Sequence, residues 1–420
     1  MGLVEHKAYQ KRAREEIDCL YNEETLPRRD DEQKMPFVRA VVKEALRWRT
    51  PLPMGVPHRN EPGDYYGGYL FPAGSTVVCN TAAIHMNPAK YDNPERFNPD
   101  RFLGHTLSMA ESAVQSDPLK LLVLGSYWDW PGSRRKDMPP GPGPTPILGN
   151  LLQLKPAVFY DQIRELNQKY GPLASLKMGS NNVILIGGDG SLVRELLDKR
   201  GSIYSNRPTE PMLKIASSGD HLLFQQDTEK WRAARKQIVR HYPRASDPEH
   251  VRLQEAESVQ LLHDFLHDPE RNMQHSMRYT TSIITCLNYG VRCATYKDPI
   301  IHGIEAIMTP RPRPPVEHFP YLPDFMVGNW KARTQHLKEL MEKIYGGKCL
   351  VCLAEIGWER GSAGLNTDNF SYKLRLNEGA TKLTRNHQAQ VCGIALEGGS
   401  DIVAGVISTA ILAYFNKVTR

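Results

Sequence analysis

Two residues of opposite charge stand three positions apart on a predicted helix, a spacing that allows an ion pair. The helix covers about residues 34–49 (MPFVRAVVKEALRWRT), and Glu44 and Arg47 share one of its faces. Most other residues of this helix are apolar, which favours a buried pair over a solvated one. A buried ion pair needs further partners to offset its desolvation. Arg96, in the downstream run PERFNPDRF, is the predicted third member.

A second pair of residues predicts an anion clamp. Trp231 and Arg235 lie four positions apart in a helix predicted over 228–240, so the indole N–H and the guanidinium project together. Both groups donate hydrogen bonds, and together they suit a carboxylate or a phosphate. The alternative is a basic amphipathic helix with one core tryptophan.

Near the end of the chain, a helix predicted over 388–417 contains two glycines and an acid in its interior. These are Gly398, Gly399 and Asp401 in LEGGSDIVAGV. Glycine inside a helix costs about 1 kcal/mol relative to alanine, and a buried aspartate adds a desolvation cost. The combination indicates that another group lies close against the helix backbone. The alternative is a helix end.

Three further patterns are less specific. The run VILIGGDGSLVREL (183–196) reads as strand, glycines and helix, but it lacks the full GxGxxG of a dinucleotide site. His263 and His267 are four apart on a helix without an obvious third metal ligand. Cys349 and Cys352 form a CxxC with apolar neighbours, which favours core packing over redox or metal chemistry.

The elements that would position these residues are mostly helices, so the predicted fold class is mainly α with a small β portion. Strands and turns are expected in DYYGGYLFPAGSTVVC (64–79), and a strand pair in LASLKMG (173–179) and NNVILIGG (181–188). Further helices are predicted at about 5–25, 158–170, 191–200, 250–267, 275–288 and 330–345. Residues 104–118 are polar and unpatterned, and 129–149 are rich in proline and glycine, so the main boundary is expected within 119–140.

Composition narrows the class of protein. The 420 residues are 40% hydrophobic, and 53 Lys and Arg against 47 Asp and Glu give a net charge of +6. The charges interleave instead of forming one basic stripe, so no nucleic-acid partner is predicted. Seven irregularly spaced cysteines predict a reducing compartment. The longest apolar run, 402–415, is 14 residues, short of the roughly 18 that a membrane span needs.

Taken together, the motifs resemble the cytochrome P-450 family of haem-thiolate monooxygenases, especially the fungal class that oxidises secondary metabolites. Glu44-Ala-Leu-Arg47 is similar to the ExxR helix of the family. Pro94-Glu-Arg-Phe97 is similar to its PERF motif, with Arg96 completing a Glu–Arg–Arg cluster. PPGPGPTPILGN (139–150) resembles the family's proline hinge.

The resemblance also implies which residues bind the cofactor, which is haem. Trp231 and Arg235 match the WxxxR helix that meets the haem propionates. His58 and Arg59 stand where the family often has a basic residue for a propionate. The segment from Gly398 through Gly399 to Asp401 resembles the oxygen-binding helix that crosses the distal face, with Asp401 as its catalytic acid.

The order of the segments differs from that of the family, in which the hinge, WxxxR and the distal helix come before ExxR and PERF. Here residues 1–118 resemble a late portion, 119–140 form a junction, and 141–420 resemble the early portion. The resemblance therefore implies a cytochrome P-450-like helical prism that is incomplete and permuted.

Two departures bear on activity. The family holds its iron with a cysteine thiolate in an FxxGxRxCxG loop after PERF, and no such loop follows Phe102. Of the seven cysteines Cys293 comes nearest, but its arginine is adjacent and a threonine replaces the final glycine, so no metal ligand is predicted. Ile402 stands where the family usually has a threonine, and isoleucine cannot relay a proton.

The resemblance implies oxidation of an apolar small molecule with electrons from NADPH–cytochrome P-450 reductase, in a protein that is catalytically defective as written. The alternative is a non-catalytic fusion or remnant of two partial gene copies. The resemblance implies a location at the surface of the endoplasmic reticulum membrane. Because no anchor is read in the sequence, we expect a cytoplasmic protein with at most peripheral membrane contact.

Overall fold

The structure is a computed structural model of the chain. It describes residues 7–21, 29–105, 133–155, 158–208, 211–216, 219–226, 229–244, 247–308, 330–341, 356–359, 362–364, 368–376 and 383–415. For some residues within these ranges, Asp401 and Ile402 among them, only the backbone is described. Cys349 and Cys352 of the CxxC pattern lie outside the described residues.

Helices dominate the described chain, with a small share of strand, so the predicted fold class is confirmed. The helices are α2 (Lys7–Leu20), α3 (Pro36–Trp48), α4 (Thr81–His85), α6 (Phe159–Tyr170), α7 (Gly190–Val193), α8 (Gly201–Tyr204), α9 (Pro211–Ala216), α10 (Glu229–His241), α11 (Pro248–His267), α12 (Asn272–Tyr289), α13 (Pro299–Met308), α14 (Trp330–Met341), α16 (Phe370–Leu376) and α18 (Arg385–Phe415). Shorter helical turns are η1 (Arg29–Lys34), η2 (Pro99–Phe102), η3 (Leu151–Gln153), η5 (Arg194–Lys199) and η6 (Pro269–Arg271). The strands are β1 (His58–Arg59), β2 (Asp64–Tyr66), β3 (Tyr69–Phe71), β4 (Thr76–Cys79), β5 (Leu173–Met178) and β6 (Asn181–Ile186).

Local signals in the sequence account for several helix ends. α3 and α11 begin at Pro36 and Pro248, where a proline costs no intrahelical hydrogen bond and its φ is already helical. α12 ends at Tyr289, and the capping residue Gly290 has a left-handed φ of 67°, which glycine readily adopts. The helix predicted over 388–417 is α18, which begins three residues earlier.

The described residues form two compact units, and the division falls within α3. One unit contains residues 43–210 and includes all the strands. The other contains the described residues up to Val42 together with those from Pro211 onward. Each unit therefore combines residues from before and after the predicted junction at 119–140.

A four-stranded sheet organises the first unit, in the order β1-β4-β6-β5. β5 and β6 are antiparallel, as the sequence predicts, and β4 pairs parallel to β6, with Val77 opposite Ile184. Both of these residues are fully buried. β-Branched residues pack well on a pleated, buried surface, and here they join strands whose segments lie on opposite sides of the junction.

Asn80 ties this sheet to α6. Its backbone N–H donates to the carbonyl of Ile186 at 2.7 Å. Its side-chain amide donates to the carbonyl of Ile163 at 2.8 Å and to Oδ1 of Asn167 at 2.7 Å. These bonds satisfy a buried amide whose loss would leave several polar groups unpaired.

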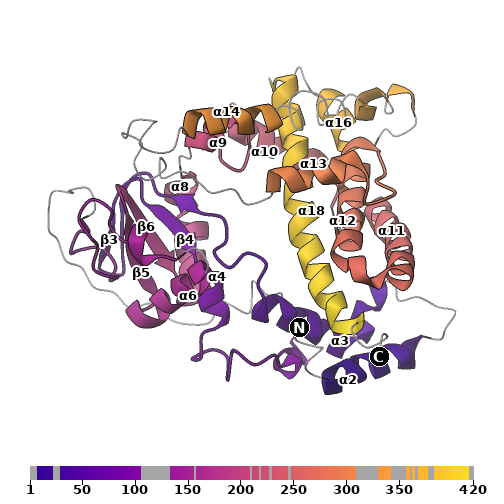
Figure 1. Ribbon diagram of the computed structural model, residues 1–420, viewed down its shortest axis with the longest axis horizontal. Helices are drawn as coiled ribbons and strands as arrows, with labels where there is room; N and C mark the ends of the chain where they lie inside the picture. The colour runs from indigo at the N-terminus through magenta and orange to yellow at the C-terminus, as the bar shows by residue number, and fades with distance from the viewer. Residues whose placement is uncertain are drawn as a thin grey trace. The chain divides into compact units, whose positions relative to one another are not determined.

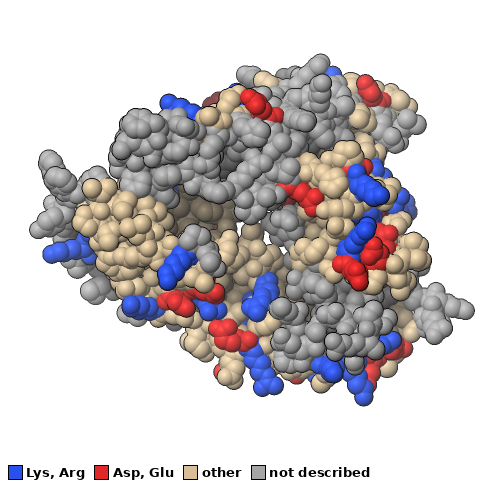
Figure 2. Space-filling view, in the orientation of Figure 1, with Lys and Arg blue, Asp and Glu red and all other residues tan. Residues whose placement is uncertain are grey.

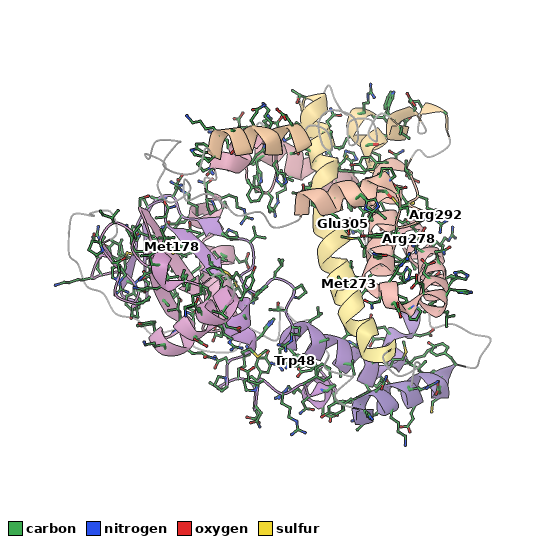
Figure 3. All side chains as sticks on the ribbon, in the orientation of Figure 1. Trp48, Met178, Met273, Arg278, Arg292 and Glu305 are labelled. Atoms are coloured by element: carbon green, nitrogen blue, oxygen red, sulfur yellow. The ribbon has the colours of Figure 1, made fainter. Side chains whose placement is uncertain are left out.

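The second unit is built from helices, with α18 packed along α12 and α12 packed along α11 (Figure 1). The hydroxyl of Thr280 on α12 donates to the carbonyl of Ser400 on α18 at 2.8 Å. Glu257 of α11 accepts from Arg278 and from Arg292, at 2.5 Å each, and these two arginines lie near one another in Figure 3. Burial favours a neutral Glu257, but the two arginines bring the pKa of its carboxyl below the ordinary value.

Within the described residues, no helix combines the length and the hydropathy needed to cross a bilayer. On the face drawn in Figure 2, lysine and arginine side chains lie next to aspartate and glutamate side chains. The charges are therefore mixed on this face, as their interleaving in the sequence predicts.

Candidate functional site

A buried ion pair at the end of α3 is the centre of the best-defined polar site. The side chains of Glu44 and Arg47 are both fully buried. Arg47 donates from Nε to Oε2 of Glu44 at 2.7 Å and from Nη2 to Oε1 at 2.8 Å. This two-bond geometry is the strongest form of the arginine–carboxylate interaction.

Arg47 also holds two stretches of backbone that follow α3. It donates from Nη1 to the carbonyl of His85 at 2.9 Å and from Nη2 to the carbonyl of Pro94 at 2.9 Å. Burial, with Arg47 and Lys90 nearby, lowers the pKa of His85 to about 4. Trp48 extends the attachment, because its indole N–H donates to the carbonyl of Glu95 at 2.7 Å; Figure 3 labels this side chain.

The structure corrects the prediction for Arg96. Arg96 is exposed, and the second arginine at Glu44 is Arg101, whose Nε lies 3.6 Å from Oε1. The cause is a turn at Asn93, which has a φ of 46° and accepts a hydrogen bond from the backbone N–H of Arg96. The following turn η2 brings Arg101 inward, and the N–H of Asn98 donates to Glu44 at 2.8 Å.

A signal for Arg101 is present in the sequence. The run PERFNPDRF contains the pattern P-x-R-F twice, as Pro94–Phe97 and as Pro99–Phe102. Spacing alone does not distinguish the two, because either arginine lies far from Glu44 along the chain. The choice depends on which turn faces α3.

His58 and Arg59 of β1 both have partners within their own unit. Nδ1 of His58 lies 2.8 Å from the carbonyl of Tyr204. Burial lowers the pKa of His58, and the neighbouring Arg207 lowers it further, so the imidazole is neutral near pH 7. Arg59 lies 2.9 Å from a carboxylate oxygen of Glu61.

Trp231 and Arg235 lie on one face of α10. The guanidinium carbon of Arg235 is 5.2 Å from the centre of the indole ring, within the range of a cation–π contact. Arg235 is exposed, and Trp231 is half-buried. The arginine is therefore accessible to an anion, and the clamp function stays a prediction.

The two glycines of α18 have different surroundings. A Cβ on Gly399 would lie 1.9 Å from Cδ1 of Ile284, so this glycine permits the close approach of α12. A Cβ on Gly398 would meet no atom within 4 Å among the described residues. Of the predicted glycine pair, one is explained by helix packing and the other faces open space. The side chains of Asp401 and Ile402 lie outside the described ones.

The weaker patterns acquire no chemistry in the structure. His263 and His267 stack with ring centres 4.0 Å apart on the exposed face of α11. No cluster of three or more His, Cys, Asp or Glu residues suited to a metal ion occurs within the described ranges. In the run 183–196 β6 leads into α7, and the backbone N–H groups of Ser191 and Leu192 donate to the side chain of its capping residue Asp189. The carboxylate of Asp189 thus accepts the hydrogen bonds that a dinucleotide phosphate would accept at this helix N-terminus.

Comparison with known proteins decides the family. The sequence profile of the cytochrome P450 family matches residues 1–117 and 139–412, which is most of the chain. The chain belongs to the cytochrome P450 family. The prediction from the ExxR, PERF and WxxxR patterns is confirmed at the level of the family.

Fungal cytochrome P450 monooxygenases are among its relatives. The chain is 36% identical to patI of Aspergillus clavatus over 306 residues, covering 70% of this chain and 56% of the relative. It is 34% identical to patI of Penicillium expansum, over 72% of this chain and 58% of the relative. A monooxygenase of Arthrobotrys oligospora is 33% identical, over 68% and 55%. The chain thus spans a little over half the length of these relatives.

Haem is the cofactor of the cytochrome P450 family, and its iron needs a thiolate donor. Burial raises the pKa of Cys79 to about 11 and that of Cys293 to about 12, and it also raises the pKa of the fully buried Cys392. In the absence of a metal ion, burial thus favours the thiol over the thiolate at these three positions. Cys19 is exposed on α2, and Cys286 is half-buried on α12.

The described cysteines therefore do not fit a haem-thiolate centre. A thiolate is expected where positive charge or hydrogen-bond donors lower the cysteine pKa, and burial has the opposite effect on Cys79, Cys293 and Cys392. Cys293 illustrates the contrast, since Arg292 beside it is committed to Glu257.

Proposed function

We propose that this chain keeps the cytochrome P450 framework but does not by itself carry out haem-thiolate monooxygenation. The observation that carries the proposal is the lack of an FxxGxRxCxG loop in the printed sequence. Burial, which raises the pKa of Cys79 to about 11 and that of Cys293 to about 12, is consistent with it.

The framework that is retained is the part that positions the chain around α3. Glu44, Arg47 and Arg101 form the charge cluster, and Arg47 fixes the backbone at His85 and Pro94. Such a cluster is costly unless every charge has partners. Glu44 and Arg47 have the partners that a buried pair requires.

The pairing of β4 with β6 supports a permuted single fold over two independent partial copies. The two strands come from the segments 1–118 and 141–420 and share one sheet in register from Thr76–Val183 to Cys79–Ile186. Two independent copies would leave these edges unpaired, and unpaired edges promote aggregation.

Without the thiolate, we expect no electron transfer from NADPH–cytochrome P450 reductase and no oxidation of an apolar small molecule by this chain alone. In this proposal, membrane contact is at most peripheral. We therefore do not propose NADPH–cytochrome P450 reductase as a partner of this chain, and its addition serves as a negative control.

The test is the absorbance spectrum of the purified chain after reconstitution with haem, reduction and exposure to carbon monoxide. We expect no strongly red-shifted Soret band. Such a band would show that a thiolate reaches the iron and would overturn the proposal. In that case Cys293→Ser and Cys79→Ser identify the ligand by loss of the band, and Cys19→Ser, on an exposed helix, is the matched control.

A further inference from the structure

One side of α11 is apolar and exposed, although the helix is amphipathic in the usual sense on its other side. Leu261 and Phe265 are buried where α11 packs on α12. Val259, Leu262 and Leu266 lie on the outer side and are 54%, 43% and 74% exposed. We refer to these three residues as the apolar stripe, because spacings of three and four place them on successive turns of one helix face.

The apolar stripe has the pattern of a helix-packing surface. Single exposed hydrophobic residues are common in soluble proteins, but a contiguous apolar patch rimmed by polar residues marks an interaction site. The spacing of Val259, Leu262 and Leu266 is that of the a and d positions of a heptad, along which two helices pack. Ala256, which is also exposed, extends the stripe by one turn with a small side chain. The stripe is therefore suited to a second helix.

Charged and polar side chains stand at both ends of the apolar stripe in the same order. Arg252 and Glu255 lie at its N-terminal end, and His267 and Glu270 lie at its C-terminal end, the last of them in the turn η6 that follows α11. All four are exposed. Arg252 also lies 3.1 Å from Glu249, but both side chains are about three-quarters exposed, so this ion pair contributes little. Each end thus offers one basic and one acidic group to a partner.

A second copy of the chain fits this order of charges when its α11 runs antiparallel. About a two-fold axis opposite Leu261, each residue faces the one equally far from that position on the other helix. Arg252 then faces Glu270 of the partner subunit, and Glu255 faces His267 of the partner subunit. The symmetry forms each of these pairs twice. A parallel arrangement would instead place like charges opposite each other, which is repulsive.

The same register lays one apolar stripe on the other. Ala256 faces Leu266 of the partner subunit, so a small side chain stands opposite a large one, and Leu262 lies next to the axis. α11 has 20 residues, which corresponds to a length of about 30 Å. A single pair of such helices falls at the small end of specific interfaces, below about 1,200 Å² in total. We therefore expect a reversible dimer.

We propose that the exposed face of α11 is the interface of a symmetric, antiparallel homodimer of this chain. The face belongs to one compact unit and involves neither haem nor a cysteine, so the proposal does not rest on the proposed function. An anionic membrane is a poorer occupant, because Glu255 and Glu270 flank the apolar stripe and would be repelled by it.

The first test is sedimentation velocity of the full chain at low ionic strength and neutral pH. Between about 1 and 100 μM, the weak end of interface affinities, the weight-average mass is expected to rise from 47.5 kDa toward twice that value. A mass of 47.5 kDa at every concentration would overturn the proposal.

Substitutions within the apolar stripe locate the interface. Val259→Glu and Leu266→Glu each place a charge where the two helices meet, so each is expected to weaken dimerisation at least about tenfold. Both positions are exposed in the single chain, and the fold is expected to stay intact by circular dichroism. Val239→Glu, at a valine of α10 that is 78% exposed, is the matched control and leaves the dimer unchanged. A dimer that is unaffected by both stripe variants would place the interface elsewhere and overturn the proposal.

A charge exchange tests the antiparallel register and identifies the partner as a second copy. Arg252→Glu and Glu270→Arg each set like charges opposite each other twice, and each is expected to weaken dimerisation about threefold or more at low salt. The chain that carries both substitutions restores opposite charges across the two-fold axis. Its dissociation constant is therefore expected to return to within about twofold of the original. Equal or additive weakening in this double variant would refute the antiparallel pairing.

Discussion

Replacing Glu44 by alanine tests whether the charge cluster at the end of α3 stabilises the fold. The change removes the carboxylate that accepts two hydrogen bonds from Arg47 and one from the backbone N–H of Asn98. Arg47 would stay fully buried, with only the carbonyls of His85 and Pro94 and the sulfur of Met86 as acceptors. The guanidinium would then carry a buried charge without a counter-ion.

The expected loss follows from that unpaired charge. Removing one partner of a buried ion pair costs about 3–5 kcal/mol, which is a large part of a total stability of about 5–15 kcal/mol. At an m value of about 2 kcal/mol per M, the urea midpoint falls by about 2 M. The unit containing residues 43–210 is expected to unfold first in the variant.

The assay is urea unfolding followed by circular dichroism and tryptophan fluorescence, with two comparisons. Glu95→Ala removes an exposed carboxylate that lies 3.5 Å from Arg164, and it is expected to cost less than about 1 kcal/mol. The double variant Glu44→Leu with Arg47→Leu removes both charges, so it is expected to recover much of the stability lost in Glu44→Ala.

Arginine variants test the corrected third member. Arg101→Ala is expected to destabilise the fold by more than Arg96→Ala, because Arg101 lies beside Glu44 and Arg96 is exposed. A Glu44→Ala midpoint equal to that of Glu95→Ala would refute the view that the pair is buried and essential. Equal effects of the two arginine variants would refute the assignment of Arg101.

Two further predictions concern α18 and a buried histidine. Gly399→Ala is expected to lower the free energy of unfolding by about 1–3 kcal/mol because its Cβ meets Ile284. Gly398→Ala, whose new Cβ meets no described atom within 4 Å, is expected to raise the free energy of unfolding by up to about 1 kcal/mol. Thermal unfolding of the two variants gives the comparison. A change of the same sign in both would contradict the packing of α12 on α18. For His85 the folded pKa of about 4 lies below the ordinary 6.5, so as the pH falls the unfolded chain binds a proton first. The stability attributable to His85 is complete above pH 6.5 and is lost between pH 6.5 and about 4, up to about 3 kcal/mol. We expect His85→Asn to remove this pH dependence from urea midpoints measured at pH 7 and pH 4.5. An unchanged difference between the two midpoints would show that the imidazole is not buried in its neutral form.

Local pattern was sufficient for the longer helices and for the residues that interact within one helix. The apolar residues of 34–49 predicted α3, and the three-residue spacing predicted the pairing of Glu44 with Arg47. The same holds for Trp231 and Arg235, which share a face of α10 because they are four residues apart. Such contacts depend on helical geometry alone.

Contacts between segments far apart in the chain could not be predicted from residue spacing. Nε2 of His221 lies 3.0 Å from a carboxylate oxygen of Glu397, but the two residues are 176 positions apart, and neither has a neighbour in sequence that marks the other. A possible signal was the polar residues within α18, but their partners could be identified only once the helices were packed. The absence of an iron-binding cysteine motif was visible in the sequence, whereas the burial that raises the pKa of Cys293 was not.

The sequence by itself determined the family, the longer helices, the strand pair β5 and β6, and the ion pair of α3, because these depend on residue types at fixed short spacings. Only the tertiary structure decided that Arg101 and not Arg96 meets Glu44, and that β4 and β6 pair across the junction. The physical reason is that a turn such as the one at Asn93 can direct either of two similar motifs inward. Which of them becomes buried is settled by the free energy of the whole packed unit, and no local pattern contains that quantity.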